Sequence, residues 1–221
     1  MINIAVDGPS ASGKSSVSRE VAKRLNILHL NTGAIYRAFG LFSLRNNIKG
    51  LPNEKELDFI IKNSNIDVKI IDGKQYTYIG DEDVSDILQV PNIAEQSSYL
   101  SQIEDIRKLA RAIQKKIAKN YNVLIEGRDI GTVILPNADF KFYITASCEE
   151  RAKRRYKQLI EKGKEADYEE ILQSIKDRDY KDEHRENSPL KIAQDAIVVD
   201  STNMDFEQTV EYILKIIKER K

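Results

Sequence analysis

The sequence predicts an α/β protein of three layers, in which helices cover both faces of a five-stranded parallel sheet. Short apolar runs alternate with amphipathic stretches along most of the 221 residues, and this alternation is typical of such a sheet. A glycine-rich loop follows the first apolar run directly and precedes a helix. A chain of this length can bury one substantial core, so we expect one main domain with insertions.

Five apolar runs are the candidate strands, namely residues 2–6, 27–30, 123–125, 140–145 and 196–199. The chain ends in an amphipathic helix, for which Asp205 is a candidate cap. We expect one apolar face of this helix to pack on the sheet. That face consists of Phe206, Val210, Ile213, Leu214 and Ile217.

One segment departs from this alternation and predicts a β-hairpin outside the main sheet. Residues 66–70 and 76–78 alternate apolar or aromatic with polar residues, and Asp72-Gly73 between them offers a tight turn. Together with residues 83–85 the hairpin predicts a small antiparallel insertion, roughly residues 59–98.

Composition excludes several classes of protein. The 35 basic residues balance 35 acidic ones, so no net field attracts nucleic acid or an anionic membrane. Asp7 interrupts the first apolar run, and no later stretch approaches the roughly 18 apolar residues of a spanning helix. The single cysteine, Cys148, forms no internal disulfide and fits a reducing compartment. We therefore expect a cytoplasmic protein without nucleic acid or membrane partners.

The strongest signal is a phosphate-binding loop that fits the pattern GxxxxGK(S/T) between a strand and a helix. Backbone N–H groups of such a loop and the dipole of the following helix bind anions. Lys14 can reach the β- and γ-phosphates of ATP, and the Ser15 hydroxyl can bind Mg²⁺. The residues assigned to nucleotide binding are Gly8, Pro9, Ser10, Ala11, Ser12, Gly13, Lys14, Ser15 and Ser16.

This loop alone does not separate kinases from other nucleotide-binding proteins. No guanine-reading NKxD segment follows it, which argues against a GTPase. Glu126 could orient water in an ATPase. A nucleotide-switched binding module, whose arginines face a protein partner, is a further alternative.

Two further segments carry groups suited to phosphate. Thr32 is expected to cap the second helix, and Arg37 follows about one turn later. Taken alone, this pattern is more typical of an ordinary cap with a surface arginine than of a phosphate site. Glu126-Gly127-Arg128-Asp129 follows the strand at 123–125, at the sheet edge where ligands of α/β proteins bind. Arg128 is a forked donor matched to phosphate, and Glu126 can hold the water shell of Mg²⁺.

With these motifs the sequence resembles the cytidylate kinase family, the bacterial type that phosphorylates CMP and dCMP. The resemblance runs nearly end to end through IAVDGPSASGKSS, NTGAIYR, EGRDIGT, RDYKDEHR and VVDST. It implies a P-loop kinase fold whose antiparallel insertion lies in the monophosphate-binding region, with a short helical lid. It also implies ATP and Mg²⁺ as requirements of the reaction.

The resemblance implies a division of the site residues. Thr32, Arg37, Arg128 and Arg185 hold the phosphate of CMP, Ser98, Arg107 and Asp129 read cytosine, and Arg178 with Asp182 contacts the sugar. The cytosine amino group suits Asp129, whereas uracil presents an acceptor there. Arg178, Asp182 and Arg185 share one helical face, which a solvated ion-pair ladder would equally explain.

The charged helix after residue 147 is expected to start in a capping box of Ser147 and Glu150 and to present arginines on one side. We assign catalytic roles to Lys14, Arg128, Arg154 and Arg155, the last two as lid donors that reach the transferring phosphoryl group. For Arg154 and Arg155, as for Arg151, the alternative is a solvated ion-pair surface. Metal binding falls to Ser15, Asp7 and Glu126.

The expected single domain comprises three parts. They are a core (1–30, 121–146 and 191–221), a monophosphate-binding region (31–120) and a lid (147–190).

Departures from the family pattern are Asn31 and Glu126, both at positions where aspartate is common, and Ser16 in place of threonine. A monomer is expected. Within enzymes, the alternative is a related kinase acting on another monophosphate or on a metabolite hydroxyl, with Asp7 or Glu126 as base.

Overall fold

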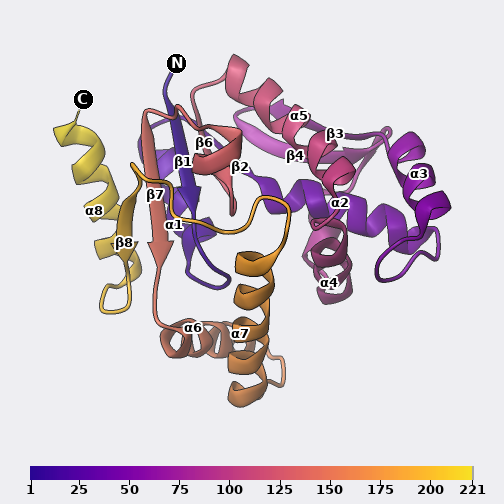
Figure 1. The fold of residues 1–221 in the computed structure, drawn as a ribbon. Coiled ribbons are helices and arrows are strands. Elements are labelled where there is room, and N and C mark those ends of the chain that lie inside the picture. Colours follow the sequence, from indigo (N-terminus) through magenta and orange to yellow (C-terminus); the bar gives the residue numbers. More distant parts are fainter. Residues whose placement is uncertain (221) are drawn as a thin grey trace. The chain divides into compact units, whose positions relative to one another are not determined.

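A computed structural model describes residues 1–220, and the chain divides into two compact units (Figure 1). The first unit comprises Met1–Ile27 and the chain from Asn122 onward, and the second is Leu28–Tyr121. The main sheet of the chain has five strands, in the order β2 (Leu28–Asn31), β6 (Val123–Glu126), β1 (Asn3–Asp7), β7 (Phe140–Thr145) and β8 (Ile197–Asp200). The expected five-stranded parallel sheet is therefore confirmed.

The first unit contains four of these strands with their helices. In chain order the elements are β1 (Asn3–Asp7), α1 (Lys14–Arg24), β6 (Val123–Glu126), the π-helical turn η2 (Ile130–Ile134), β7 (Phe140–Thr145), α6 (Cys148–Glu161), α7 (Tyr168–His184), β8 (Ile197–Asp200) and α8 (Phe206–Glu219). β1 pairs in parallel with β6 and β7, and β7 pairs with β8. Successive residues Ile4, Ala5 and Val6 are all buried, as expected for a central strand covered on both faces.

Helices α1 and α8 share one core cluster with the strands of this unit. The cluster includes Ile4 and Phe142 of the sheet, Val21 of α1, and Val210 and Ile213 of α8. The prediction that α8 packs on the sheet is confirmed. Asp205 caps α8 in a capping box with Gln208, which fixes where the helix begins.

The predicted apolar face of α8 is wrong at one residue, Phe206. The side chain of Phe206 is 48% exposed, whereas Val210, Ile213 and Ile217 are at most 1% exposed. Phe206 is the first helical residue after the Asp205 cap, so its side chain lies at the open end of the helix.

The second unit contains β2 (Leu28–Asn31), α2 (Thr32–Arg45), α3 (Glu54–Asn63), β3 (Ile66–Ile71), β4 (Lys74–Ile79), β5 (Glu82–Asp83), the 3₁₀ turn η1 (Ser85–Gln89), α4 (Pro91–Leu100) and α5 (Glu104–Asn120). Strands β3, β4 and β5 form a separate antiparallel sheet. Asp72 and Gly73 both have positive φ, 50° and 71°, as a tight hairpin turn requires. The predicted hairpin and antiparallel insertion are confirmed.

The insertion packs against the flank of α2 through a second core cluster. Ala38 and Leu41 of α2 pack there with Val84, Leu88 and Ile93, and Ile66 and Ile79 of the hairpin lie against them. The hairpin is therefore anchored to the helix that follows β2.

Candidate active site

The phosphate loop joins β1 to α1, and its backbone geometry depends on glycine. Gly8 has φ +152°, and a Cβ added there would lie 2.1 Å from the Ile144 carbonyl oxygen. Gly13 is the N-cap of α1 in the left-handed region, with φ 82°. Residues 8–16 thus form one continuous loop and first helical turn, as the motif predicts.

The loop lies beside the segment that follows β6. Val6 of β1 is in register with Glu126 of β6, and the Gly127 N–H donates to the Val6 carbonyl at 2.9 Å. Because both strands end at the same edge of the sheet, Lys14 and Arg128 leave from neighbouring points. The expected placement of the Glu126–Asp129 segment at this edge is confirmed.

Lys14 is buried in a group of cations. Its Nζ donates to the Pro9 carbonyl at 2.9 Å, and the residue is 7% exposed. Burial lowers the pKa of Lys14 well below its ordinary value, and repulsion from Arg128 and Arg178 adds to this, while Glu126 acts in the opposite sense. Such crowding of positive charge favours binding of a polyanion.

Arg128 of this group is held by an acidic partner, Asp182. Arg128 Nε donates to Asp182 Oδ2 at 2.8 Å, with side-chain exposures of 17% and 14%. Burial opposes the charge of Arg128, but Asp182 outweighs it and raises the pKa. Burial also raises the pKa of Asp182, but Arg128 and Arg178 outweigh it and lower the pKa below its ordinary value. Four predicted site residues of unit one, Lys14, Arg128, Arg178 and Asp182, are therefore electrostatically coupled.

Two further predicted residues of this unit, Arg185 and Asp129, lie near each other. Arg185 Nη2 is 3.9 Å from Asp129 Oδ1, and both side chains are at most 7% exposed. Arg185 Nε also donates to the Ser188 carbonyl at 2.7 Å. The structure thus brings a buried arginine to the carboxylate assigned to cytosine.

A buried ion pair that the sequence did not predict braces the phosphate loop at Ser10. Arg151 Nη1 of α6 is 2.6 Å from Asp179 Oδ2 of α7. Arg151 Nη1 also donates to the Ser10 carbonyl at 2.8 Å, and the Ser10 N–H donates to Asp179 Oδ1 at 3.1 Å. Asp179 directly follows Arg178, and nothing in the charged sequence of α7 distinguishes it from a solvated residue.

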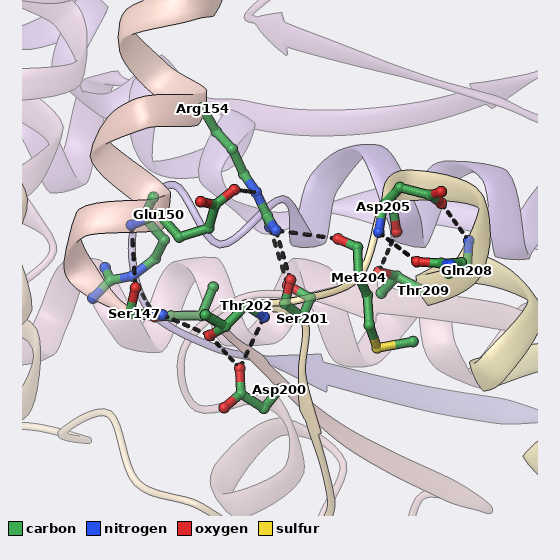
Figure 2. A network of polar contacts seen from close by, with 12 residues as sticks. Ser147, Glu150, Arg154, Asp200, Ser201, Thr202, Met204, Asp205, Gln208 and Thr209 are labelled. Atoms are coloured by element: carbon green, nitrogen blue, oxygen red, sulfur yellow. Dashed lines mark hydrogen bonds and ion pairs between the residues drawn. The ribbon is translucent and has the colours of Figure 1, made fainter.

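The three arginines of α6 have different partners. Arg154 binds Glu150 at 3.0 Å and donates to the Ser201 and Met204 carbonyls at 2.6 and 3.3 Å (Figure 2). Arg155 is exposed and donates to Gln158 at 2.7 Å. Arg154 therefore joins α6 to the loop after β8.

The predicted capping box of α6 is only half present. Ser147 Oγ accepts from the Glu150 N–H at 3.2 Å. The reciprocal bond does not form, because the Ser147 N–H donates to Thr202 Oγ1 at 3.0 Å and the Glu150 carboxylate accepts from Arg154 (Figure 2). Asp200 in turn accepts from both the N–H and the hydroxyl of Thr202.

In the second unit, the start of α2 differs by one residue from the prediction. Asn31, not Thr32, is the N-cap, since its Oδ1 accepts from the Ala34 N–H at 3.2 Å. Thr32 is the first helical residue and is 4% exposed. Asparagine is among the strongest N-cap residues, which explains why the helix begins one position earlier than expected.

Arg37 folds back over the first turn of α2. A Cβ added to Gly33 would lie 3.1 Å from both Arg37 Nη1 and Asn31 Oδ1. The guanidinium therefore lies at the N-terminus of its own helix, next to two residues of the NTG segment. This placement suits a phosphate, because the helix dipole and the arginine act on the same point.

The two remaining predicted residues of the second unit, Ser98 and Arg107, lie on α4 and α5. Ser98 is half-buried on α4. Arg107 of α5 is 1% exposed, and its Nη1 donates to the Ser101 carbonyl at 3.0 Å. The guanidinium carbon lies 5.7 Å from the centre of the Tyr36 ring. Tyr36 is thus part of the packing around a buried cation.

The predicted metal-binding residues differ in how they are used. Both carboxylate oxygens of Asp7 accept backbone N–H groups, from Ile130 and Gly131, at 2.8 Å each. Burial raises the pKa of Asp7 to about 6. Glu126 is 2% exposed and acts electrostatically on Lys14. Ser15 and Glu126 offer the hard oxygen donors that Mg²⁺ prefers, whereas Asp7 is directed at the backbone.

Two absences hold for residues 1–220. Within them, no group of three or more His, Cys, Asp or Glu side chains is arranged to hold a metal ion. No helix in the same range is long and apolar enough to cross a membrane.

The parallel sheet, the phosphate loop and the cations beside it define a P-loop kinase. Solved structures with this fold include a shikimate kinase from Acinetobacter baumannii, with TM-score 0.50 and 13% identity over 100% of this chain and 95% of that one. A gluconokinase from Sinorhizobium meliloti also has TM-score 0.50 and 13% identity, over 99% and 92% of the two chains. At this identity the likeness concerns the fold alone.

Sequence relatives specify the family. The profile of the cytidylate kinase family matches residues 4–219. A cytidylate kinase from Caldicellulosiruptor saccharolyticus is 45% identical over 97% of this chain and 95% of its own length. One from Fusobacterium nucleatum is 42% identical over 100% and 99%. The chain belongs to the cytidylate kinase family.

Proposed function

We propose that this protein transfers the γ-phosphoryl group of ATP to CMP or dCMP, giving ADP and CDP or dCDP. The observation that carries this proposal is the group of Lys14, Arg128 and Arg178 beside the phosphate loop, in which Lys14 is buried and Asp182 holds Arg128. Such a concentration of fixed positive charge stabilises two phosphates that repel each other. Membership of the cytidylate kinase family supports CMP as the acceptor.

The donor side is assigned to the phosphate loop. Its backbone N–H groups and the N-terminus of α1 bind the phosphates of ATP. Lys14 leaves the Pro9 carbonyl, to which it donates in the ligand-free chain, and moves to the β- and γ-phosphates. The added anion removes the mutual repulsion of the cations, which favours the charged form of Lys14.

The acceptor side is assigned residue by residue from the motifs of the family. Thr32, Arg37, Arg128 and Arg185 bind the CMP phosphate, and Arg178 with Asp182 binds the sugar. Ser98, Arg107 and Asp129 read cytosine, because the amino group of the base donates to the Asp129 carboxylate. Uracil would leave that buried carboxylate facing an acceptor, at a cost of about 1–3 kcal/mol.

The reaction needs no general base. The phosphate of CMP is already anionic near neutral pH, since its second pKa is about 6. The protein's task is to align donor and acceptor in line and to neutralise the charge that crowds between them. Ser15 and Glu126 would hold Mg²⁺, which would supply positive charge to the oxygens of the ATP phosphates.

Helices α6 and α7 are assigned to a lid, residues 147–190, that excludes water from the transferring phosphoryl group. Arg154 and Arg155 are its candidate donors. Arg154 must leave the Ser201 and Met204 carbonyls to act in this way, whereas Arg155 is already exposed to solvent. The other two parts of the proposed single domain are the core (1–30, 121–146 and 191–221) and the monophosphate-binding region (31–120).

The setting follows from the substrates and the composition. We place the protein in the cytoplasm, where ATP and nucleoside monophosphates are available and where a single cysteine stays reduced. A monomer suffices for this function, because every assigned residue lies in one chain.

One screen tests the proposed function. The protein is incubated with ATP, Mg²⁺ and each of CMP, dCMP, UMP, AMP and GMP, and diphosphate product is separated by chromatography. CDP or dCDP should form at the highest kcat/KM, with UMP poorer by about tenfold or more. Formation of ADP without phosphorylation of any added monophosphate would point to a hydroxyl acceptor or a nucleotide switch and would refute the proposal.

A further inference from the structure

The antiparallel insertion holds the residue that opens α2 through one side chain, Gln75 of β4. The Asn31 N–H donates to Gln75 Oε1 at 2.8 Å, and Gln75 Nε2 donates to the Asn31 carbonyl at 3.2 Å. Both backbone hydrogen-bonding groups of Asn31 are thus bound by one side-chain amide. Since Asn31 is the N-cap of α2, this pair of bonds fixes the direction in which the helix leaves β2.

Gln75 is itself held by a chain of polar contacts within the insertion. Its Nε2 lies 3.4 Å from Thr77 Oγ1, and the Thr77 N–H donates to Ser85 Oγ at 2.9 Å. Ser85 Oγ in turn donates to Asp83 Oδ1 at 2.6 Å. Thr77 is 1% exposed, so this series of polar contacts starts from a buried residue. The position of the Gln75 amide is therefore set by the insertion and not by solvent.

The insertion also contacts the opposite end of α2. Arg45, in the last turn of the helix, binds Glu82 of β5 with two hydrogen bonds of 2.5 and 2.8 Å. Both side chains are at least 41% exposed, so the energy of this pair is small. The insertion thus contacts α2 at its N-terminus through a partly buried amide and at its C-terminus through an exposed ion pair.

The end that Gln75 holds is the one with phosphate-compatible groups. Asn31 Oδ1 and Arg37 Nη1 would each lie 3.1 Å from a Cβ on Gly33, so the cap, the glycine and the guanidinium are in close contact. A shift of the Asn31 peptide would move the backbone N–H groups of the first turn relative to Arg37. Donors to a phosphate must keep their relative positions within about half an ångström.

We propose that Gln75 is a positioning residue for the acceptor nucleotide, through which the antiparallel insertion sets the geometry of the α2 N-terminus. This inference deepens the proposed function and rests on it. Gln75 acts through Asn31 and does not touch the nucleotide. The competing explanation is that Gln75 only satisfies two backbone groups at the end of β2, in which case its loss would lower stability and leave CMP binding unchanged.

The test is Gln75→Met, which keeps the length of the side chain and removes both hydrogen bonds. We expect KM for CMP to rise about tenfold, the effect of losing about two neutral hydrogen bonds. KM for ATP and kcat at saturating CMP should stay within about twofold, because the phosphate loop is unchanged. Calorimetric titration with CMP alone should show the same loss of affinity.

Glu82→Gln is the matched control, since it weakens the other contact between the insertion and α2. It should leave KM for CMP within about twofold, as expected for an exposed ion pair. An unchanged KM for CMP in folded Gln75→Met would overturn the inference, and so would an equal rise in Glu82→Gln, which would indicate general loosening. Thermal melting of each variant identifies the folded fraction.

Should Gln75→Met be too unstable to assay, Gln75→Glu replaces it. This variant keeps an acceptor for the Asn31 N–H and removes the donor to the carbonyl, so KM for CMP should still rise, by about threefold or more. An unchanged value would again overturn the inference. Failure of the proposed function is recognised separately, because the unsubstituted protein would then form no CDP at all.

Discussion

The phosphate loop of the first unit and the N-terminus of α2 in the second unit are both candidate phosphate sites, but they are built differently. The loop is one continuous segment in which glycines at 8 and 13 set the backbone. The α2 site combines a capping asparagine, an arginine one turn later and a glutamine more than forty positions away, at 75. The first site is therefore local in sequence and the second is not.

The difference concerns which groups carry the chemistry. Backbone amides are present in every sequence, so only the glycines and the lysine mark the loop. Side-chain donors need a scaffold that fixes their rotamers, and this scaffold comes from elsewhere in the chain. We expect substitutions at the loop to affect phosphoryl transfer directly, and substitutions at the α2 site to affect acceptor affinity.

Lys14→Ala should produce the largest effect and tests the loop as the donor site. Removing the ammonium should lower kcat by about a thousandfold or more, since it acts on charge that develops in the transition state. A coupled assay of ADP formation measures the rate, and circular dichroism checks that the fold persists. Turnover equal to that of the unsubstituted protein would show that the loop is not the donor site.

Arg151→Met should show that the loop needs a brace as well. The substitution leaves Asp179 as a buried charge without its ion pair, which should lower the free energy of unfolding by about 3–5 kcal/mol. Urea denaturation measures the loss. Arg155→Met, on the exposed side of the same helix, is the control and should change stability by less than about 0.5 kcal/mol. Equal effects of the two would contradict a bracing role for Arg151.

Gly33→Ala should give the smallest effect and tests the α2 site. An added Cβ would lie 3.1 Å from Arg37 Nη1 and Asn31 Oδ1, which requires these flexible side chains to shift by a few tenths of an ångström. KM for CMP should rise about threefold while KM for ATP stays constant. Initial rates at varied CMP and ATP measure both constants. A rise in KM for ATP alone would reverse the assignment of the two sites.

Much of the fold could be predicted because its signals are local. The five apolar runs each coincide with a strand to within one or two residues. For the central strands β1 and β6, which are buried almost throughout, the reason is that a strand covered on both faces needs a continuous apolar stretch. The Asp72-Gly73 turn and the Asp205 cap could likewise be predicted from the local sequence. The start of α2 was misplaced by one residue, because both Asn31 and Thr32 are good caps.

The candidate site was predictable only in part. Its residue types followed from the motifs and the family resemblance, and the buried Lys14 is electrostatically coupled to the half-buried pair of Arg128 and Asp182. In the sequence Arg151 is one of three similar arginines, and its burial against Asp179 and Ser10 depends on how α6 and α7 pack. Gln75 carries no signal in sequence, because a single glutamine on a strand is ordinary until its partner is known.

The linear order of residues was sufficient to identify the strands and the phosphate loop, since each depends on contiguous groups whose spacing is set by covalent geometry, while the reaction class followed from the family resemblance of several separated motifs. Which charged side chains are buried, which of them brace the loop and which hold the α2 N-terminus emerged only with the packing of distant segments. The physical reason is that the energy of a charge or an amide is set by its burial and its partners, and neither is a property of the residue itself.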